Sequence, residues 1–313
     1  MPASANTTFE NQMPPAGARI LVAMSGGVDS VAAAAVLVRS GYTCMGATLR
    51  MTAEPDSRPV FEPCCGLQAV ADAKNACDRL EMEHRTIRIV EAFDQHIIAP
   101  FVREYAAGRT PNPCIRCNRM IKFGLMYQYA RRWGFDYIAM GHYVLLTKRN
   151  GRMALRRSAY REKDQSYVLA PLSQPQLKRS CFPLGAMTKS EARSLAATVD
   201  AGVGAKAESQ EICFVADRNY ARIVEERGNA GKPGNIVDVD GNVLGIHKGI
   251  HHYTIGQRRG LGISAPEPLY IIRIDPENNT IMVGRNGQFL CGAFDTGPLF
   301  WGGLAPYSKS FRA

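Results

Sequence analysis

The sequence predicts an α/β protein in which a parallel-sheet domain is followed by a smaller β-rich domain. In the first half, short apolar runs alternate with helical segments, which is the pattern of strands joined by crossover helices. From Pro233 onward the chain is Gly-rich and strand-like. A length of 313 residues suits about two domains. A charged fraction of 21% beside 46% hydrophobic residues excludes wholesale disorder.

Four strands and four helices are predicted in the first half. The apolar runs at 19–24, 42–49, 86–90 and 135–140 are typical of buried strands. Helices are predicted at 30–40, 66–80, 92–107 and 118–133, and Gly41, Gly108 and Gly134 end three of them. Ligands of such sheets bind beyond the carboxyl ends of the strands, so we expect the functional site there.

The second half begins with different signals. Asn150-Gly151 predicts a hairpin, and Thr188 with Glu191 predicts a capping-box start for a helix reaching about Val199. Further turns are predicted at Asp240-Gly241 and at 276–279. The predicted division is a flexible leader at 1–17, a catalytic domain at 18–220, a small β-rich domain at 221–295 and a tail at 296–313.

Charge favours a polyanionic partner. Lys and Arg number 38 against 28 Asp and Glu, a formal charge of +10. The basic residues cluster in two stretches: Lys148, Arg149, Arg152, Arg156, Arg157, Arg161 and Lys163, and Arg116, Arg119, Lys122, Arg131 and Arg132. Such clusters suit phosphate contacts, although a basic protein without such a partner has the same composition. No apolar run approaches the ~20 residues of a membrane helix, and the first 17 residues do not read as a secretory signal.

Nine cysteines, an odd count without a signal peptide, indicate a reducing cytosol and a cytoplasmic protein rather than a disulfide framework. Apolar neighbours predict that Cys44, Cys77, Cys181 and Cys291 are small core residues. The thiols with polar or turn-like surroundings are Cys64, Cys65, Cys114, Cys117 and Cys213.

The string Ser25-Gly26-Gly27-Val28-Asp29-Ser30 follows a predicted strand and opens a helix. Its glycines let the backbone approach an anion, and the first amides of the helix would face phosphates. Asp29 could cap the helix or help to hold Mg²⁺. The plain alternative is an ordinary strand-to-helix turn. The string matches neither GxxxxGK[ST] nor GxGxxG.

Cys114 and Cys117 follow a proline-stiffened loop, and the next helix is expected to begin near Asn118. Cys117 would then lie at a helix N-terminus beside Arg116 and Arg119, which lowers the pKa of a thiol. A zinc half-site, a thioredoxin-like dithiol and a nucleophilic site are the three interpretations, and the last is favoured. Cys213 taken by itself would be a buried core thiol.

The phosphate-loop string resembles that of the ATP pyrophosphatase family, the adenine nucleotide alpha hydrolase-like proteins. Seven ordered motifs then resemble the bacterial tRNA-specific 2-thiouridylase family over about residues 18–290. They are AMSGGVDS (23–30), AGRTPNPCIRCN (107–118), IKFG (121–124), MGHYV (140–144), KDQSYVL (163–169), EICFV (211–215) and HHYTIGQRRGLGI (251–263).

This resemblance implies an enzyme that adenylates O2 of the wobble uridine in tRNAs for Lys, Glu and Gln and then replaces that oxygen with sulfur. The implied ATP contacts are Ala23, Met24, Ser25, Gly26, Gly27, Val28, Asp29 and Ser30, together with Leu49 and Gly141. The implied tRNA contacts are Asn112, Pro113 and Cys114, and Lys163, Asp164 and Gln165. Cys213 matches the cysteine that receives a persulfide from an upstream sulfur-carrier protein, and Cys117 matches the nucleophile that resolves it, releasing sulfide or leaving a transient disulfide. The target base would be flipped out.

Two features depart from the family pattern. Many members carry Asp where this chain has Cys114, and members with a CxxC…C set are thought to hold a [4Fe-4S] cluster with one open iron. Three thiolates, Cys114, Cys117 and Cys213, suit such a cluster, so persulfide and cluster routes both stay open. The family also has a C-terminal β-barrel domain, and residues 296–313 do not resemble its start, which predicts a truncated or divergent tail.

Other interpretations remain. The chain could be another adenylating enzyme of the pyrophosphatase type, or a catalytically incomplete RNA-binding fragment. Lys163 and Asp164 could form a plain surface ion pair, and His142 could be a packed histidine. His251 and His252 are expected on a strand with opposite orientations, which argues against a shared metal.

Overall fold

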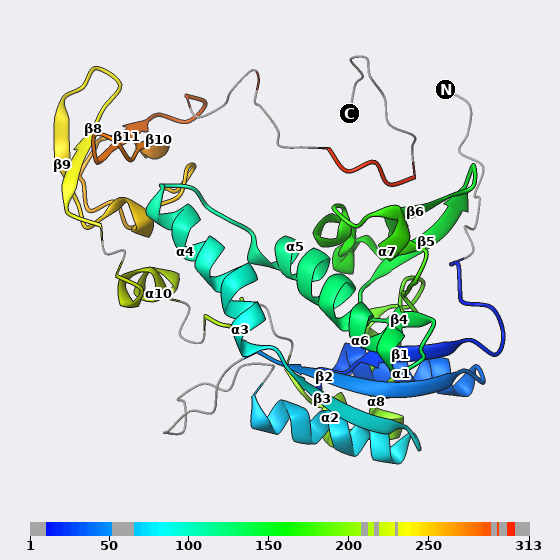
Figure 1. The fold of residues 1–313 in the computed structure, drawn as a ribbon. Coiled ribbons are helices and arrows are strands. Elements are labelled where there is room, and N and C mark those ends of the chain that lie inside the picture. The colour runs from blue at the N-terminus through cyan, green and yellow to red at the C-terminus, as the bar shows by residue number, and fades with distance from the viewer. Residues whose placement is uncertain are drawn as a thin grey trace. The chain divides into compact units, whose positions relative to one another are not determined.

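The computed structural model describes residues 11–51, 66–207, 212–215, 219–228, 231–288, 293 and 299–303 (Figure 1). Cys64, Cys65 and Cys291 lie outside these ranges. The chain forms two compact units. Unit 1 contains residues 1–93, 114–214 and 299–313, and unit 2 contains residues 94–113 and 215–298. The sequence predicts domains that are each one continuous segment. In the structure, residues 94–113 belong to the same unit as residues 215–298 and not to the unit that surrounds them in the sequence.

Unit 1 is built on a five-stranded sheet with the order β3-β2-β1-β4-β7, in which every strand pair is parallel. The strands are β1 (Arg19–Ala23), β2 (Thr43–Arg50), β3 (Glu83–Arg88), β4 (Tyr137–Ala139) and β7 (Ser180–Cys181). The predicted parallel sheet is therefore confirmed. The third strand begins three residues earlier than predicted, because pairing with β2 includes the polar residues Glu83 to Arg85.

One face of this sheet is covered by helices α1 (Val28–Arg39), α2 (Leu67–Arg79) and α8 (Lys189–Val199). Ile20 and Val22 of β1 belong to this core, while Leu21 between them is also fully buried but points the other way, as the alternation of a strand requires. The core is rich in alanine along α1, which lets α1 approach the strands closely. Cys77 packs in this core directly over Gly46, where a Cβ would fall 2.3 Å from its sulfur.

The helix predicted at 118–133 begins earlier. A continuous helical run contains α5 (Pro113–Cys117), the π-helical segment η2 (Asn118–Leu125) and α6 (Met126–Arg132). Proline is favoured in the first turn of a helix because its missing N–H needs no partner there, which explains the start at Pro113. The helix predicted at 92–107 is likewise divided, into α3 (Val90–Phe93), the π-helical η1 (Asp94–Ile98) and α4 (Ala99–Ala106).

The remaining elements of unit 1 follow β4. The hairpin of β5 (Val144–Arg149) and β6 (Arg152–Arg157) turns at Asn150 and Gly151, both with positive φ, as predicted. Short helices follow: η3 (Arg161–Lys163), η4 (Ser166–Leu169), α7 (Gln174–Leu177) and, after α8, α9 (Ala201–Gly204). Thr188 and Glu191 form both bonds of the predicted capping box at α8.

Both described ends of the chain pack on unit 1. Asn11 accepts a hydrogen bond from the amide of Leu146 (3.0 Å), so residues 11–14 of the predicted leader make specific contacts. Arg152 donates to the carbonyl oxygens of Trp301 (2.9 Å) and Gly302 (3.2 Å). The guanidinium of Arg119 lies 4.4 Å from the ring centre of Phe300.

Unit 2 contains a four-stranded sheet with the order β10-β11-β8-β9. Its strands are β8 (Gly234–Val237), β9 (Val243–His247), β10 (Tyr270–Asp275) and β11 (Thr280–Gly284), which confirms the β-rich second domain. It also contains η1, α4, α10 (Tyr220–Glu226) and the 3₁₀ turn η5 (Ile250–His252). Tyr105 of α4 stacks on Tyr220 of α10 with ring centres 4.5 Å apart, which ties the early segment to the later one.

Candidate functional site

The candidate site lies where the strand order of the unit 1 sheet reverses. From β1 the chain continues to β2 and β3 on one side, whereas β4 and β7 lie on the other. The carboxyl ends of β1 and β4 therefore lie at the switch point of the strand order, which is where open α/β sheets bind nucleotides. Ser25 to Ser30 follow β1, and Gly141 follows β4 at this edge.

The phosphate loop between β1 and α1 is held by its own serines. The Ser25 amide (3.2 Å) and hydroxyl (3.2 Å) both donate to the Ser30 hydroxyl, which donates to the carbonyl oxygen of Gly27 (2.9 Å). Gly27 occupies the N-cap position of α1, and no side chain caps this helix. The first amides of the 12-residue helix are therefore available to an anion, and the helix dipole favours negative charge there.

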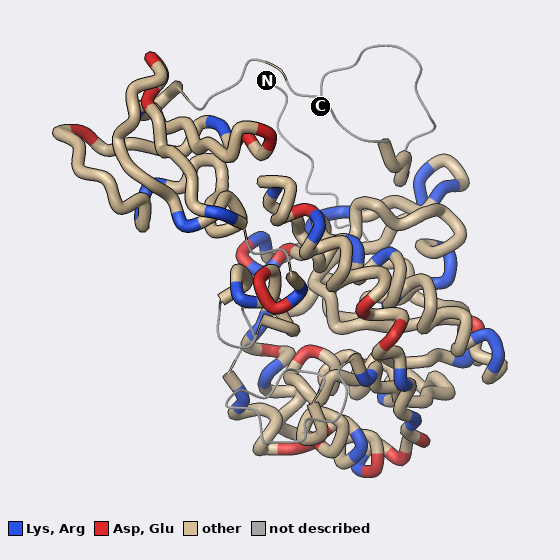
Figure 2. The backbone as a smooth tube through the Cα atoms, turned by 60° about the vertical axis from the view of Figure 1, so that its left-hand side comes forward, with Lys and Arg blue, Asp and Glu red and all other residues tan. Residues whose placement is uncertain are grey.

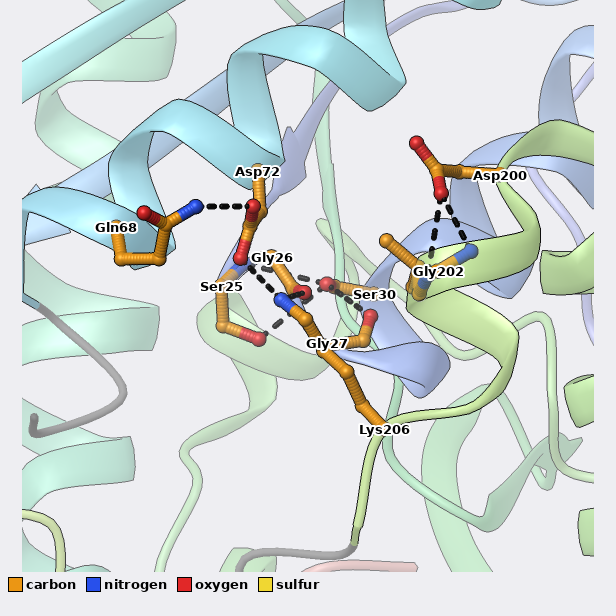
Figure 3. Close-up of polar contacts among 10 residues, drawn as sticks. Ser25, Gly26, Gly27, Ser30, Gln68, Asp72, Asp200, Gly202 and Lys206 are labelled. Atoms are coloured by element: carbon orange, nitrogen blue, oxygen red, sulfur yellow. Dashed lines mark hydrogen bonds and ion pairs between the residues drawn. The ribbon is translucent and has the colours of Figure 1, made fainter.

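Gly26 satisfies two steric demands. Its φ of +68° lies in the left-handed region, and a Cβ would fall 2.5 Å from the carbonyl oxygen of Ala69 in α2. Helix α2 therefore packs directly on the loop. Lys206 strengthens this contact, because its ammonium donates to the Gly26 carbonyl oxygen (2.8 Å) and pairs with Asp72 of α2 (Figure 3). Gln68 donates to the other oxygen of Asp72 (2.8 Å).

Asp29 has a different role from the helix cap that its position suggests. Its Oδ1 accepts hydrogen bonds from the Tyr143 hydroxyl (2.7 Å) and from the Lys189 ammonium (2.7 Å). Gly141 makes the approach of this segment possible, since a Cβ there would fall 2.6 Å from the Asp29 carbonyl group. The sequence analysis does not identify Lys189 and Lys206, because both lie far along the chain from the loop. Tyr143 lies inside the quoted motif at 140–144, but the sequence assigns it no role.

The other nucleotide-contact candidates lie on neighbouring strands. Leu49 is 7% exposed near the carboxyl end of β2. Thr48 beside it donates to the carbonyl oxygen of Met24 (2.8 Å), so β2 supports the residue that precedes the loop. Ala23 is the last residue of β1, and Val28 is the first of α1. The residues that we predict for ATP thus share one edge of the sheet.

Cys114 and Cys117 lie one helical turn apart on α5, with Cys114 exposed and Cys117 8% exposed. The expectation that Cys117 begins a helix is wrong. Its backbone is helical (φ −60°, ψ −46°) and the helix starts at Pro113, so Cys114 is the thiol in the first turn. Residues at i and i+3 share a helix face, so both side chains lie on one side of α5. Asn112 immediately precedes this helix.

Cys213 is half-buried in the described stretch 212–215, and Phe214 beside it packs edge-on against Phe93 with ring centres 5.8 Å apart. Cys213 does not join Cys114 and Cys117 in a set with all ligand atoms within 4.8 Å. Within the described part of the chain, the set of three candidate ligands that meets this distance is Glu225, His251 and His252. An iron–sulfur cluster holds its cysteines farther apart than a single ion does, because several iron atoms lie between them.

The segment Lys163–Gln165 lies beside η3 and connects to the phosphate loop. Asp164 accepts hydrogen bonds from the Ser158 amide (2.8 Å) and the Ser166 hydroxyl (2.7 Å), which makes its carboxylate an organiser of this turn. Gln165 exchanges two hydrogen bonds with the backbone of Tyr143, each 3.0 Å long. Since Tyr143 also donates to Asp29, the turn and the loop share one residue.

Burial distinguishes the cysteines and the histidine that pack in the protein from the cysteines that are candidates for chemistry. Desolvation raises the pKa of Cys44 and of Cys77 to about 12 and that of Cys181 even further, which keeps these thiols protonated. The predicted core position is confirmed for Cys77 and Cys181, whereas Cys44 is half-buried beside that core. His142 is packed near Phe123 and Phe182, and burial, followed by the charge of Lys122, lowers its pKa well below the usual value. It is a neutral core residue.

Figure 2 shows Lys and Arg interspersed with Asp and Glu along the backbone tube. The basic residues Lys148 and Arg149 are exposed at the tip of the β5–β6 hairpin. Over the described ranges, no helix is both long and apolar enough to cross a membrane.

Comparison with known proteins identifies the family. Residues 18–217 match the family model of the tRNA methyl transferase HUP domain, and residues 222–285 match that of the tRNA methyl transferase PRC-barrel domain. The chain is 45% identical over 272 residues to the tRNA-specific 2-thiouridylase MnmA of Lachnoclostridium phytofermentans, covering 86% of this chain and 76% of that protein. The protein of the same name from Geotalea uraniireducens is 46% identical over 274 residues, covering 85% and 72%.

Among solved structures, a 4-thiouridine synthetase–RNA complex with bound ATP aligns over 67% of this chain and 50% of that chain, with 11% identity and a TM-score of 0.39. At this score the alignment supports no further conclusion.

The parallel sheet, with a phosphate-type loop at its switch point, defines a nucleotide-binding α/β protein of the HUP class. Within that class, the chain belongs to the tRNA-specific 2-thiouridylase family. The descriptions of both family models name methyl transfer, which the phosphate loop does not support. A methyl donor such as a sulfonium needs no phosphate site, whereas the uncapped start of α1 suits a polyphosphate.

Proposed function

We propose that this protein is an ATP-dependent tRNA 2-thiouridylase that converts the wobble uridine of tRNAs for Lys, Glu and Gln to 2-thiouridine. The observation that carries the proposal is the uncapped N-terminus of α1 beneath a glycine loop at the switch point, in a chain that also brings Cys114 and Cys117 onto one helical turn. Family membership at about 45% identity supports the same activity.

In the first step, O2 of the uridine attacks the α-phosphorus of ATP and pyrophosphate leaves. This converts a poor leaving oxygen into an AMP ester. The loop residues 25–30 would hold the phosphates through backbone amides, and Lys206 and Lys189 would keep the loop in position. Mg²⁺ would accompany the triphosphate, and Asp29 is the one carboxylate in the loop at residues 25–30.

In the second step, sulfur displaces AMP from C2. On the persulfide route, a sulfur-carrier protein delivers sulfur to Cys213. The Cys117 thiolate attacks the inner sulfur of that persulfide, hydrosulfide leaves and attacks C2, and a Cys117–Cys213 disulfide remains. A cellular thiol then returns two electrons to this disulfide.

On the cluster route, Cys114, Cys117 and Cys213 would hold a [4Fe-4S] group, which would supply a free coordination position for the sulfide. Three thiol side chains with one open position suit this group chemically. No cysteine disulfide forms on this route, so the two routes differ in their need for a reductant.

The tRNA would contact Asn112, Pro113, Cys114 and the turn at Lys163, Asp164 and Gln165. The shared hydrogen bonds of Gln165, Tyr143 and Asp29 support this proposal, because they give RNA binding at the turn a short connection to the ATP loop. Flipping the uridine out of the anticodon stack would expose its C2.

The test is thiolation by anaerobically purified protein whose iron and sulfide contents are recorded. The reaction contains ATP, Mg²⁺, a sulfur source and unmodified tRNA-Lys, and 2-thiouridine is measured by nucleoside mass spectrometry. We expect product from the wild type, none from Cys117→Ser or Cys213→Ser, and wild-type yield from Cys44→Ser, which alters a half-buried thiol outside the site. Turnover only in iron-loaded protein supports the cluster route, and reductant-dependent turnover without iron supports the persulfide route.

Pyrophosphate release that is independent of tRNA and of both cysteines would instead identify another adenylating enzyme. tRNA binding without any pyrophosphate release would identify an RNA-binding protein that has lost catalysis. Either result would refute the proposed function.

A further inference from the structure

A second cluster of chemically capable side chains lies in unit 2, among residues that the proposed thiolation does not use. Glu225 lies on α10, and His251 and His252 lie on the turn η5. The expectation that these histidines diverge on a strand is wrong, because the segment forms a 3₁₀ turn instead. Their rings lie side by side, with centres 4.2 Å apart and planes at 38°.

Both histidines point the same nitrogen at the same oxygen. Nε2 of His251 lies 3.2 Å and Nε2 of His252 lies 3.1 Å from Oε1 of Glu225. Ligand atoms from all three residues lie within 4.8 Å of one another. Around a tetrahedral zinc ion with bonds of about 2.0–2.1 Å, neighbouring ligand atoms are about 3.3 Å apart. Both nitrogen–oxygen distances in the cluster are close to this edge length.

The surrounding structure fixes these side chains. His251 is 2% exposed, and its Nδ1 edge lies against Gly231 and Gly249, where a Cβ would fall 3.1 Å and 2.9 Å from Nδ1. This packing directs Nε2 of His251 toward Glu225. Helix α10 is held to η5 because the Tyr220 hydroxyl donates to the carbonyl oxygen of His252 (3.1 Å).

The three side chains differ in solvent exposure: His251 is buried, whereas His252 and Glu225 are partly exposed. The side chains of His252 and Glu225 are 31% and 42% exposed, so an ion can enter from solvent and keep a water ligand. The Nδ1 of His251 has no hydrogen-bond partner among the described residues. Most metal-binding histidines donate from their other nitrogen, so this gap weakens binding and suggests micromolar rather than tighter affinity.

We propose that Glu225, His251 and His252 bind a borderline divalent transition-metal ion, with Zn²⁺ as the best fit, and that the ion joins α10 to the turn η5. Two imidazoles and one carboxylate form a His₂Glu set, which leaves a fourth tetrahedral position for water. Imidazole nitrogens favour Zn²⁺ over Mg²⁺ or Ca²⁺, which prefer oxygen ligands. The site is independent of the proposed thiolation.

The competing explanation is a hydrogen-bonded cluster without metal, in which both imidazoles donate to one carboxylate oxygen. The two explanations differ in metal stoichiometry, so Zn²⁺ is the probe. Chelator-treated full-length protein is titrated with Zn²⁺ by calorimetry in a background in which all five non-core cysteines are replaced by serine, which removes the competing thiolates. These cysteines are Cys64, Cys65, Cys114, Cys117 and Cys213.

We expect one equivalent of Zn²⁺ to bind this background, and we expect Glu225→Gln or His252→Gln to weaken it at least tenfold. Glu226→Gln is the matched control, because Glu226 is the next residue on α10 and pairs with Arg222 instead. It should bind as the background does. Equal binding by all four proteins, or no binding by the background at micromolar Zn²⁺, would overturn the proposal.

Co²⁺ spectroscopy of the same background protein tests the proposal even if the Glu225 and His252 variants fail to fold. Co²⁺ in the proposed site should give visible ligand-field bands without the intense near-ultraviolet band of a thiolate ligand. It should also give two strongly shifted imidazole N–H signals in the proton NMR spectrum. A thiolate band with no shifted imidazole signals would assign the metal to cysteines and would refute the proposal.

Discussion

Lys206 connects the phosphate loop to α2 by serving two acceptors at once. It donates to the Gly26 carbonyl oxygen (2.8 Å) and pairs with Asp72, whose side chain is only 16% exposed. Removing the ammonium would leave a poorly hydrated carboxylate beside the loop where we propose that the triphosphate binds, and like charges would then repel. The single lysine therefore supports the loop geometry and neutralises a carboxylate beside the proposed ATP site.

We predict that Lys206→Met weakens ATP binding about tenfold or more, since a hydrogen bond to a charged group contributes about 1.5–3 kcal/mol. The measurement is the calorimetric Kd for ATP. Lys74→Met is the matched control, because Lys74 also pairs with an aspartate of α2, Asp78, but on the exposed surface. The control should change the Kd by less than about twofold. An unchanged Kd for Lys206→Met would show that the loop holds its form without this contact.

Sequence reasoning found the residues that are adjacent in a motif and missed those that meet only in the fold. The residues of the phosphate loop at 25–30 are consecutive, so their glycines and serines are recognisable as a motif. Lys189 and Lys206 reach the loop from more than 150 residues away, and nothing in their local sequence separates them from surface lysines. A strand at His251 and His252 would direct the two side chains to opposite faces. The segment forms a 3₁₀ turn instead, which places the two rings side by side.

At the scale of elements, the segment after β4 packs against the start of α1. The contact depends on Gly141, where a Cβ would fall 2.6 Å from the backbone of Asp29. Asp29 belongs to the phosphate loop, so the packing of these two elements also determines the shape of the proposed ATP site.

We predict that Gly141→Ala lowers the free energy of unfolding by about 1–3 kcal/mol, as overpacking does, and weakens ATP binding. Denaturant unfolding and ATP calorimetry measure the two effects. Gly302→Ala is the control, since a Cβ at Gly302 would meet nothing within 4 Å. If Gly141→Ala matched this control in both assays, the contact would not shape the site.

Some element boundaries can be predicted from local sequence signals alone, and others cannot. The capping box at Thr188 and the turn at Asn150-Gly151 are local, and both are confirmed. The helix around Cys117 was predicted to start five residues too late, at Asn118 rather than Pro113. The prolines were interpreted as loop residues, although Pro113 suits the first turn of a helix. Sheet order and the grouping of 94–113 depend on distant contacts, so no local pattern predicts them.

For the whole molecule, the formal charge of +10 makes tRNA binding sensitive to salt. Lys148 and Arg149 at the hairpin tip are exposed and belong to the longer basic cluster. Each phosphate contact that such residues make releases counterions, which gives a measurable slope of binding against salt.

We predict that the double variant Lys148→Ser/Arg149→Ser reduces the slope of log K against log salt by about 1–2, at roughly 0.7–0.9 for each phosphate contact. Filter binding of tRNA at several salt concentrations measures it. The charge-preserving pair Lys148→Arg/Arg149→Lys should keep the wild-type slope. A slope that does not change in the serine variant would assign tRNA binding to other basic residues.

The grouping of residues 94–113 with residues 215–298 has a consequence for synthesis on the ribosome. Phe101, Val102 and Tyr105 of α4 are buried in the finished protein, and Tyr105 stacks on Tyr220. These apolar side chains leave the ribosome before residues 114–214 and so wait for 101 further residues before their partners exist. At about 5–20 residues per second the wait is on the order of 5–20 s. During that interval the nascent chain carries an amphipathic helix whose apolar face has no partner, and an exposed apolar face of this kind is a target for chaperones.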